Sequence, residues 1–184
     1  MADKRLQSRW ESDVTTTTPH VVNRFVIDSD DTFDEMRQRY ESLVPTIDFG
    51  NLAEVIATGD LSRVQQYTAE HAPNSFVNFW TLDPMPMMRL AGNQQRAITY
   101  LMGNNVIAET MFRHHPGIIL YAPLRTAIYE DTLGRAYFSI DQPSSKFASF
   151  GDARIASVGV HLDAKLAKLL QLMALPVPSE LIAP

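Results

Sequence analysis

The sequence predicts an α+β fold in which helices pack on one face of an antiparallel sheet. Five stretches have strand character and only a few helical stretches connect them, whereas a parallel sheet would need a crossover helix between successive strands. With 184 residues, of which 45% are hydrophobic and 20% charged, the chain has ordinary globular composition and can bury one sizeable core. A single domain is therefore expected.

The chain is expected to begin its fold with a strand and a helix. Residues 20–27 alternate between two faces, as strand residues do. The apolar residues of the following segment, 33–43, fall on one helical stripe. Ser29 or Asp30 can cap this helix, and Pro45 ends it.

Weaker helical spacing follows over 51–71. The break at Gly59 and the capping residue Asp60 divide this segment into two short helices, an insertion spanning about 50–73. The aromatic-rich stretch 75–82 predicts a strand. The segment after it, 83–93, has two prolines in four residues and is expected to be an irregular connection.

The second half of the chain predicts three more strands and two helices. A strand over 96–102 precedes a helix over 105–115, which Pro116 and Gly117 end. A long strand over 118–129 and its hairpin partner over 135–140 follow. Asp152 or a near neighbour opens the last helix, whose buried stripe is Leu162, Leu166, Leu169, Leu170 and Met173.

The hairpin sequence also predicts its own register. A loop of Thr132, Leu133 and Gly134 puts glycine at the left-handed position of a three-residue hairpin and pairs Asp131 with Arg135. A four-residue loop would shift the pairing by one residue and mix apolar with polar side chains on both faces. The expected cross-strand pairs are Ile128 with Phe138, Thr126 with Ile140, Tyr129 with Tyr137, Ala127 with Ser139, and Arg125 with Asp141.

This register gathers polar and aromatic side chains on one sheet face. They are Tyr121, Arg125, Tyr129, Tyr137, Ser139 and Asp141. Such a face can be a solvated surface with an ordinary ion pair, a dimer interface rich in Tyr and Arg, or a ligand cavity. In a cavity, Arg125 would receive an anionic group, the tyrosines would form hydrogen-bonding walls, and Asp141 would be the partner of Arg125 or a base.

His114 and His115 are the other chemical feature of the chain. Adjacent helical residues point about 100° apart, so the two cannot form a metal pair from one helix, and no metal site is expected. In the last turn of a helix, cationic side chains interact favourably with the terminal carbonyls, which is the simplest interpretation of this pair. The functional alternative uses one histidine: His115 as a general acid or base, or either one as an axial haem ligand.

Composition limits the compartment and the partners. The net charge is −5, and the sixteen basic residues are scattered, which disfavours a nucleic-acid partner. The absence of cysteine fits a reducing compartment, and no stretch has the apolar length of a signal peptide or a membrane span. We expect a cytoplasmic protein without a membrane partner, made of a flexible arm (1–19), one α+β domain (20–175) and a proline-rich tail (176–184).

The second half of the chain resembles the domain-of-unknown-function 302 family. The resemblance rests on the helix beginning NNVIAE, the strand carrying APLR, the charged hairpin and the segment DQPSSKF, and it extends over most of Phe25 to Leu172. It implies a curved antiparallel sheet crossed by helices, similar to the TATA-binding-protein-like fold, and a homodimer. It brings no catalytic residues, and the insertion at 50–73 is longer than in small members.

Three functions are compatible with these observations. The first is a small-molecule-binding domain for an anionic or apolar ligand, with acid-base chemistry of the isomerase or lyase kind that uses His115, Asp141 and Tyr121. The second is a haem-binding protein with His114 or His115 as axial ligand. The third is a non-enzymatic homodimeric module that binds another chain through the tyrosine-arginine face and the proline-rich tail.

Overall fold

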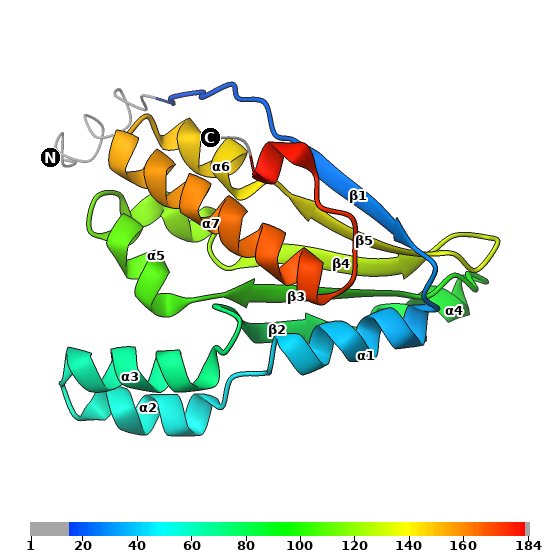
Figure 1. The fold of residues 1–184 in the computed structure, drawn as a ribbon, viewed down its shortest axis with the longest axis horizontal. Helices are drawn as coiled ribbons and strands as arrows, with labels where there is room; N and C mark the ends of the chain where they lie inside the picture. Colours follow the sequence, from blue (N-terminus) through cyan, green and yellow to red (C-terminus); the bar gives the residue numbers. More distant parts are fainter. Residues whose placement is uncertain (1–14, 183–184) are drawn as a thin grey trace, which may run out of the picture.

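The computed structural model describes residues 15–182, and most of the expected N-terminal arm lies outside them. Its centre is one antiparallel sheet with the strand order β1-β5-β4-β3-β2 (Figure 1). The strands are β1 (Arg24–Ser29), β2 (Val77–Leu82), β3 (Ala97–Gly103), β4 (Leu124–Glu130) and β5 (Ala136–Asp141). The sheet is open, and the expected α+β class is confirmed.

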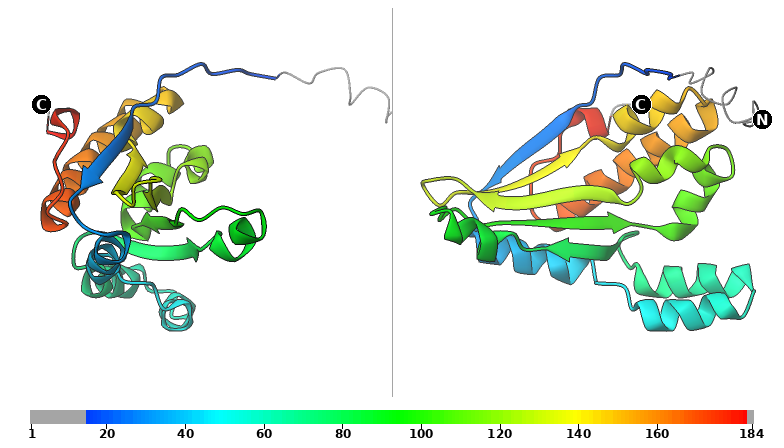
Figure 2. Two further views of the ribbon diagram at one scale, coloured as in Figure 1. Left: turned by 90° about the vertical axis from the view of Figure 1, so that its right-hand side faces the viewer. Right: turned by 180° about the vertical axis from the view of Figure 1, so that it is seen from behind.

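Two helices, α1 and α7, lie on the same side of the sheet (Figure 2). The α-helices are α1 (Phe33–Leu43), α2 (Phe49–Ala57), α3 (Leu61–His71), α4 (Met85–Leu90), α5 (Asn105–Phe112), α6 (Pro143–Phe147) and α7 (Ala153–Leu172). Short 3₁₀ helices span Pro116–Leu120, Ala148–Phe150 and Ser179–Leu181. Among the described residues, no helix has both the length and the apolar character needed to cross a membrane.

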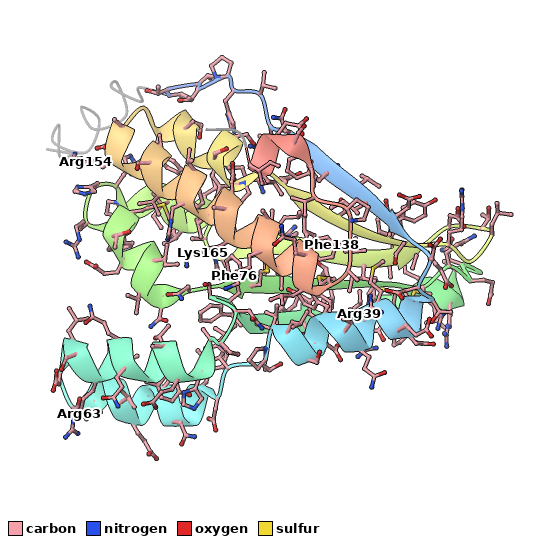
Figure 3. The ribbon with its side chains drawn as sticks, in the orientation of Figure 1. Arg39, Arg63, Phe76, Phe138, Arg154 and Lys165 are labelled. Atoms are coloured by element: carbon pink, nitrogen blue, oxygen red, sulfur yellow. The ribbon has the colours of Figure 1, made fainter. Side chains whose placement is uncertain are left out.

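The main core lies between the sheet and α1 and α7. Alternate residues of the central strands, among them Tyr100, Ile128 and Phe138, point toward these helices and are fully buried. Two side chains labelled in Figure 3 also join distant segments by hydrogen bonds. Arg39 Nη1 of α1 donates to the carbonyl oxygen of Met173 after α7 at 2.7 Å, and Lys165 Nζ of α7 donates to Ser75 Oγ before β2 at 2.9 Å.

The insertion forms the two expected helices. Asp60 caps α3, and Gly59 between the helices has a φ of +68°. The α2–α3 pair packs on a small core of its own, made of Ile47, Leu52, Tyr67, Ala72 and Val77. The insertion is therefore a satellite unit beside the main core.

Capping chemistry explains where α1 begins. Thr32 is the cap residue, instead of the expected Ser29 or Asp30. Its hydroxyl accepts from the Glu35 amide at 3.3 Å, while the Glu35 carboxylate accepts from the Thr32 amide at 2.8 Å. This reciprocal capping box satisfies two amides that the helix leaves unpaired.

Two expected irregular or extended segments are helical instead. The connection after β2 contains α4, because prolines are tolerated in the first turn of a helix, where no amide donor is needed. The expected strand over 118–129 begins only at Leu124, because Pro116–Leu120 forms a 3₁₀ turn capped by His115. Tyr121 therefore lies before the strand and not on it.

The C-terminal segment packs against the domain. The chain turns back after α7, and Leu181 is buried in the main core with 3% of its surface exposed. Burial of this apolar side chain holds the described part of the segment, up to residue 182, against the domain.

The predicted register of the β4–β5 hairpin is confirmed. Ile128 lies opposite Phe138 and Tyr129 opposite Tyr137, and the Asp131 amide donates to the Arg135 carbonyl oxygen at 3.0 Å. Gly134 has a φ of +79°, as the three-residue loop requires.

Gly134→Ala should lower the free energy of unfolding by about 1 kcal/mol, because a residue with a Cβ is strained at this φ. Urea denaturation of the variant and of Thr132→Ala in the same loop measures the difference. Equal stability of Gly134→Ala and wild type would contradict the turn geometry.

Candidate functional site

The sheet face opposite α1 and α7 carries a hollow of about 730 Å³, which we call the sheet-face hollow. It lies over the middle of the sheet, and the chain between α5 and β4 forms one wall. Its lining residues are Arg24, Val26, Leu101, Ile119, Leu120, Tyr121, Pro123, Arg125, Thr126, Ala127, Tyr129, Ser139, Asp141 and Lys146.

Most of the site residues predicted from the sequence meet at this hollow. Arg125, Tyr129, Ser139 and Asp141 reach it from β4 and β5, and Tyr121 reaches it from the linker before β4. The sixth member of the predicted face, Tyr137, stacks on Tyr129 with ring centroids 5.4 Å apart. The pairing register accounts for this, because cross-strand partners point to the same face.

The expected ion pair between Arg125 and Asp141 does not form. The Asp141 carboxylate instead pairs with Arg24 Nε at 3.0 Å and with Lys146 Nζ at 2.9 Å. Arg24 lies directly opposite Asp141 in the β1–β5 pairing, and the turn into α6 brings Lys146 back over the end of β5. The Asp141 carboxylate is therefore already paired with two cations, neither of them from β4.

Arg125 is consequently a cation without a carboxylate. Its side chain is exposed, and among residues 15–182 it forms neither an ion pair nor a side-chain hydrogen bond. The residues that line the hollow include three cations, Arg24, Arg125 and Lys146, and one carboxylate, that of Asp141. The hollow is thus locally positive in a protein whose net charge is −5.

The state of Asp141 follows from its surroundings. Burial raises the pKa of this carboxyl, but the hydrogen bonds from Lys146 and Arg24 outweigh burial and hold the pKa below its ordinary value. Asp141 is therefore an ionised structural anion at neutral pH, which does not favour the predicted role as a base.

A histidine that the sequence analysis did not select lies at the rim. His20 Nε2 is 3.1 Å from the Tyr121 hydroxyl oxygen, and Lys146 Nζ lies 5.3 Å from the centre of the Tyr121 ring. His20 and Tyr121 are 101 positions apart, so no local spacing could indicate the pair. Only the alternation of 20–27, which places a strand start here, pointed to this region.

The predicted titrating group, His115, has another role. Its Nδ1 accepts a hydrogen bond from the Gly117 amide at 3.0 Å, and its ring packs on Phe150 with centroids 5.1 Å apart. Because α5 ends at Phe112, His115 caps the next turn and does not line the sheet-face hollow. His114 does not line it either, so the geometry favours neither histidine as an acid, a base or a haem ligand.

A buried polar network fixes the two segments that complete the rim. Asp163 of α7 is 4% exposed and accepts from the Ser144 amide at 2.9 Å and from Gln142 Nε2 at 2.8 Å. Gln142 Oε1 in turn accepts from Asn23 Nδ2 at 2.8 Å. This chain of hydrogen bonds holds α6, which carries Lys146, and the segment before β1, which carries His20.

Asp141→Asn should destabilise the protein by about 1 kcal/mol at pH 7, because it leaves the half-buried Lys146 without its anion. The pKa of Asp141 is depressed by folding, so its contribution is complete above the unfolded value of roughly 3.9 and is lost as the pH falls through the folded value. The difference from wild type should therefore shrink at pH 3.

Urea denaturation at pH 7 and pH 3 measures this difference. Asp30→Asn is the matched control, because Asp30 is exposed and has no hydrogen-bond partner among the described side chains. A destabilisation of Asp141→Asn that is the same at both pH values would contradict the ion-pair assignment.

Comparison with known proteins identifies the family. No curated protein matches the chain. The crystal structure of an uncharacterized conserved protein DUF302 from Bacillus stearothermophilus is similar in fold, with a TM-score of 0.59 and 11% identity over 82% of this chain and 97% of that chain. The model of the family described as "Domain of unknown function DUF302" matches residues 62–173. Since this match covers more than half of the 184 residues, the resemblance is confirmed and the chain belongs to the DUF302 family.

Proposed function

We propose that this protein binds a small organic anion with an apolar portion in the sheet-face hollow. The observation that carries the proposal is the guanidinium of Arg125, which lies on the central strand β4, is exposed and has no carboxylate partner among the described residues. An unpaired guanidinium offers a planar fork of donors that matches a carboxylate, sulfonate or phosphate group.

The walls of the hollow support an amphipathic ligand. Val26, Leu101, Ile119 and Leu120 supply apolar surface around the cations. Ligand sites in proteins commonly combine a mostly apolar lining with a few polar groups that fix orientation. The Tyr129 ring and the Ser139 hydroxyl group lie on the same face.

We extend the proposal to acid-base chemistry at the rim. The Tyr121 hydroxyl, which is in hydrogen-bond contact with His20, is the group best placed to exchange a proton with a molecule bound at Arg125. Histidine is the side chain that most often transfers protons in enzymes, so the pair suits isomerase-type or lyase-type chemistry. His20 thus takes the place that the sequence analysis gave to His115.

Binding of 1-anilinonaphthalene-8-sulfonate, an aromatic sulfonate whose fluorescence reports apolar surroundings, tests the anion site. Arg125→Ala should weaken its binding about tenfold or more, because a charge-assisted hydrogen bond is worth about 1.5–3 kcal/mol. Arg63→Ala is the matched control, since Arg63 lies on α3, outside the residues that line the hollow. Equal affinity of Arg125→Ala and wild type, with both proteins folded by circular dichroism, would refute the proposal.

A second candidate function is a homodimeric interaction module that uses the same sheet face. The observation that favours it is the exposure of Trp80 (47%) and Leu82 (43%) on the edge strand β2, together with Val26 (53%) on the opposite edge strand β1. Pairing places Trp80 beside Leu101, which lines the hollow, so the apolar surface continues across the sheet. Exposed apolar surface of this kind is common at protein interfaces.

Trp80→Glu should convert a dimer formed through this face into a monomer, because it puts an unpaired charge in the interface. Sedimentation velocity of the variant and of Ile56→Glu, another exposed apolar position, located on α2, measures the change. A monomeric wild type, or a dimer that survives Trp80→Glu, would contradict this second function and would leave the anion site standing.

A further inference from the structure

A second cavity, partly open to solvent, lies on the side of the sheet that the helices cover. It has a volume of about 180 Å³ and is found where β3 ends, beneath α5. Its inner wall consists of buried side chains from the β2 entry, α5, β4, α6 and α7: Phe76 (labelled in Figure 3), Met111, Leu124, Phe147 and Leu162. We call it the α5 cavity.

The α5 cavity is partly open to solvent, while its inner wall is buried. Protein interiors are packed nearly as densely as organic crystals. The apolar inner wall of the α5 cavity has no side chains packed on it and therefore lacks the dispersion contacts that a filled interior supplies. A small apolar molecule would restore those contacts, and apolar cavities of roughly 150 Å³ in other proteins take up benzene or xenon.

The lining defines the chemical class of the occupant. None of the residues that line the cavity is charged, so an ionic ligand would lose its hydration without gaining a partner. Of the two polar side chains, Asn104 is engaged with the Val106 amide and the Ser75 carbonyl oxygen, and Asn105 accepts from the Thr68 hydroxyl group. What remains is an apolar surface that favours an uncharged molecule.

The aromatic lining narrows this class further. The rings of Phe76, Phe79 and Phe147 and the thioether of Met111 all face the cavity. Ring-edge contacts and sulfur-aromatic contacts both favour an aromatic ligand over an aliphatic one of equal size. Ala108 of α5 is half-buried and lines the cavity as well.

We propose that the α5 cavity is a binding site for a small uncharged aromatic molecule of about one ring. This site does not depend on the anion site in the sheet-face hollow, although Pro123 lines both. The protein thus has two sites of opposite chemical preference, one on each side of the linker before β4.

Methyl NMR of the full chain with benzene as the probe tests the site directly. Benzene should shift the methyl resonance of Met111 in a saturable way, because the ring current acts on a methyl group at the cavity wall. Met87, which is 65% exposed, is the internal control. A Met111 resonance that moves no more than that of Met87 at saturating benzene would overturn the proposal.

A filling variant supplies the second test and separates the two sites. Ala108→Leu puts three more carbon atoms into the cavity and should weaken benzene binding at least tenfold, while Ala53→Leu, an exposed helical position on α2, should leave it unchanged. Arg125→Ala should also retain benzene binding, and Ala108→Leu should retain binding of 1-anilinonaphthalene-8-sulfonate. If folded Ala108→Leu binds benzene like wild type, the aromatic site is refuted whatever the outcome at Arg125.

Discussion

The register of the β4–β5 hairpin is the constraint on which the rest of the structure depends. Because side chains alternate along a strand, a slip of one residue would move Ile128 and Phe138 from the core to the open face and bring Tyr129 and Tyr137 inside. The loop that ends in Gly134 prevents this slip. Since β1 pairs with β5 and β3 with β4, the same register decides which residues of the whole sheet reach α7 and which reach the hollow.

Competition for one carboxylate gives the open face its chemical character. Asp141 has three cations within the hollow and pairs with two of them, so the third is left to solvent or to a ligand. The pairing is geometric: Arg24 is the direct neighbour of Asp141 across the β1–β5 ladder, and Lys146 follows it by five positions through the turn into α6. The chain as a whole has a net charge of −5. The preference of the hollow for anions therefore results from the local arrangement of Arg24, Arg125 and Lys146, and not from the overall charge.

Local patterns predicted what depends on neighbours in sequence. Alternation and turn chemistry were sufficient for the β4–β5 register and for four residues of the hollow, Arg125, Tyr129, Ser139 and Asp141, since these features lie within one hairpin. Tyr121 also lines the hollow, but it reaches it from the linker before β4 and not from the expected strand. Sequence reasoning failed where distant segments meet: His20 contacts Tyr121 across 101 positions, and Arg24 displaces Arg125 from Asp141. It also failed between His115 and Pro123, where helix-ending residues begin a new turn.

The position of β1 at the edge of the sheet has a consequence for how the protein folds. Strands β2 to β5 pair with their neighbours in sequence, but Arg24 of β1 must find Asp141, 117 positions later. Closing so long a loop costs conformational entropy, and contacts between residues far apart in the sequence therefore form slowly. During synthesis on the ribosome, we therefore expect the β5 edge to stay unpaired until it has left the exit tunnel, with β1 waiting as a free segment. The hollow, which needs Arg24 and Val26 from β1, can then form only after β5 has emerged.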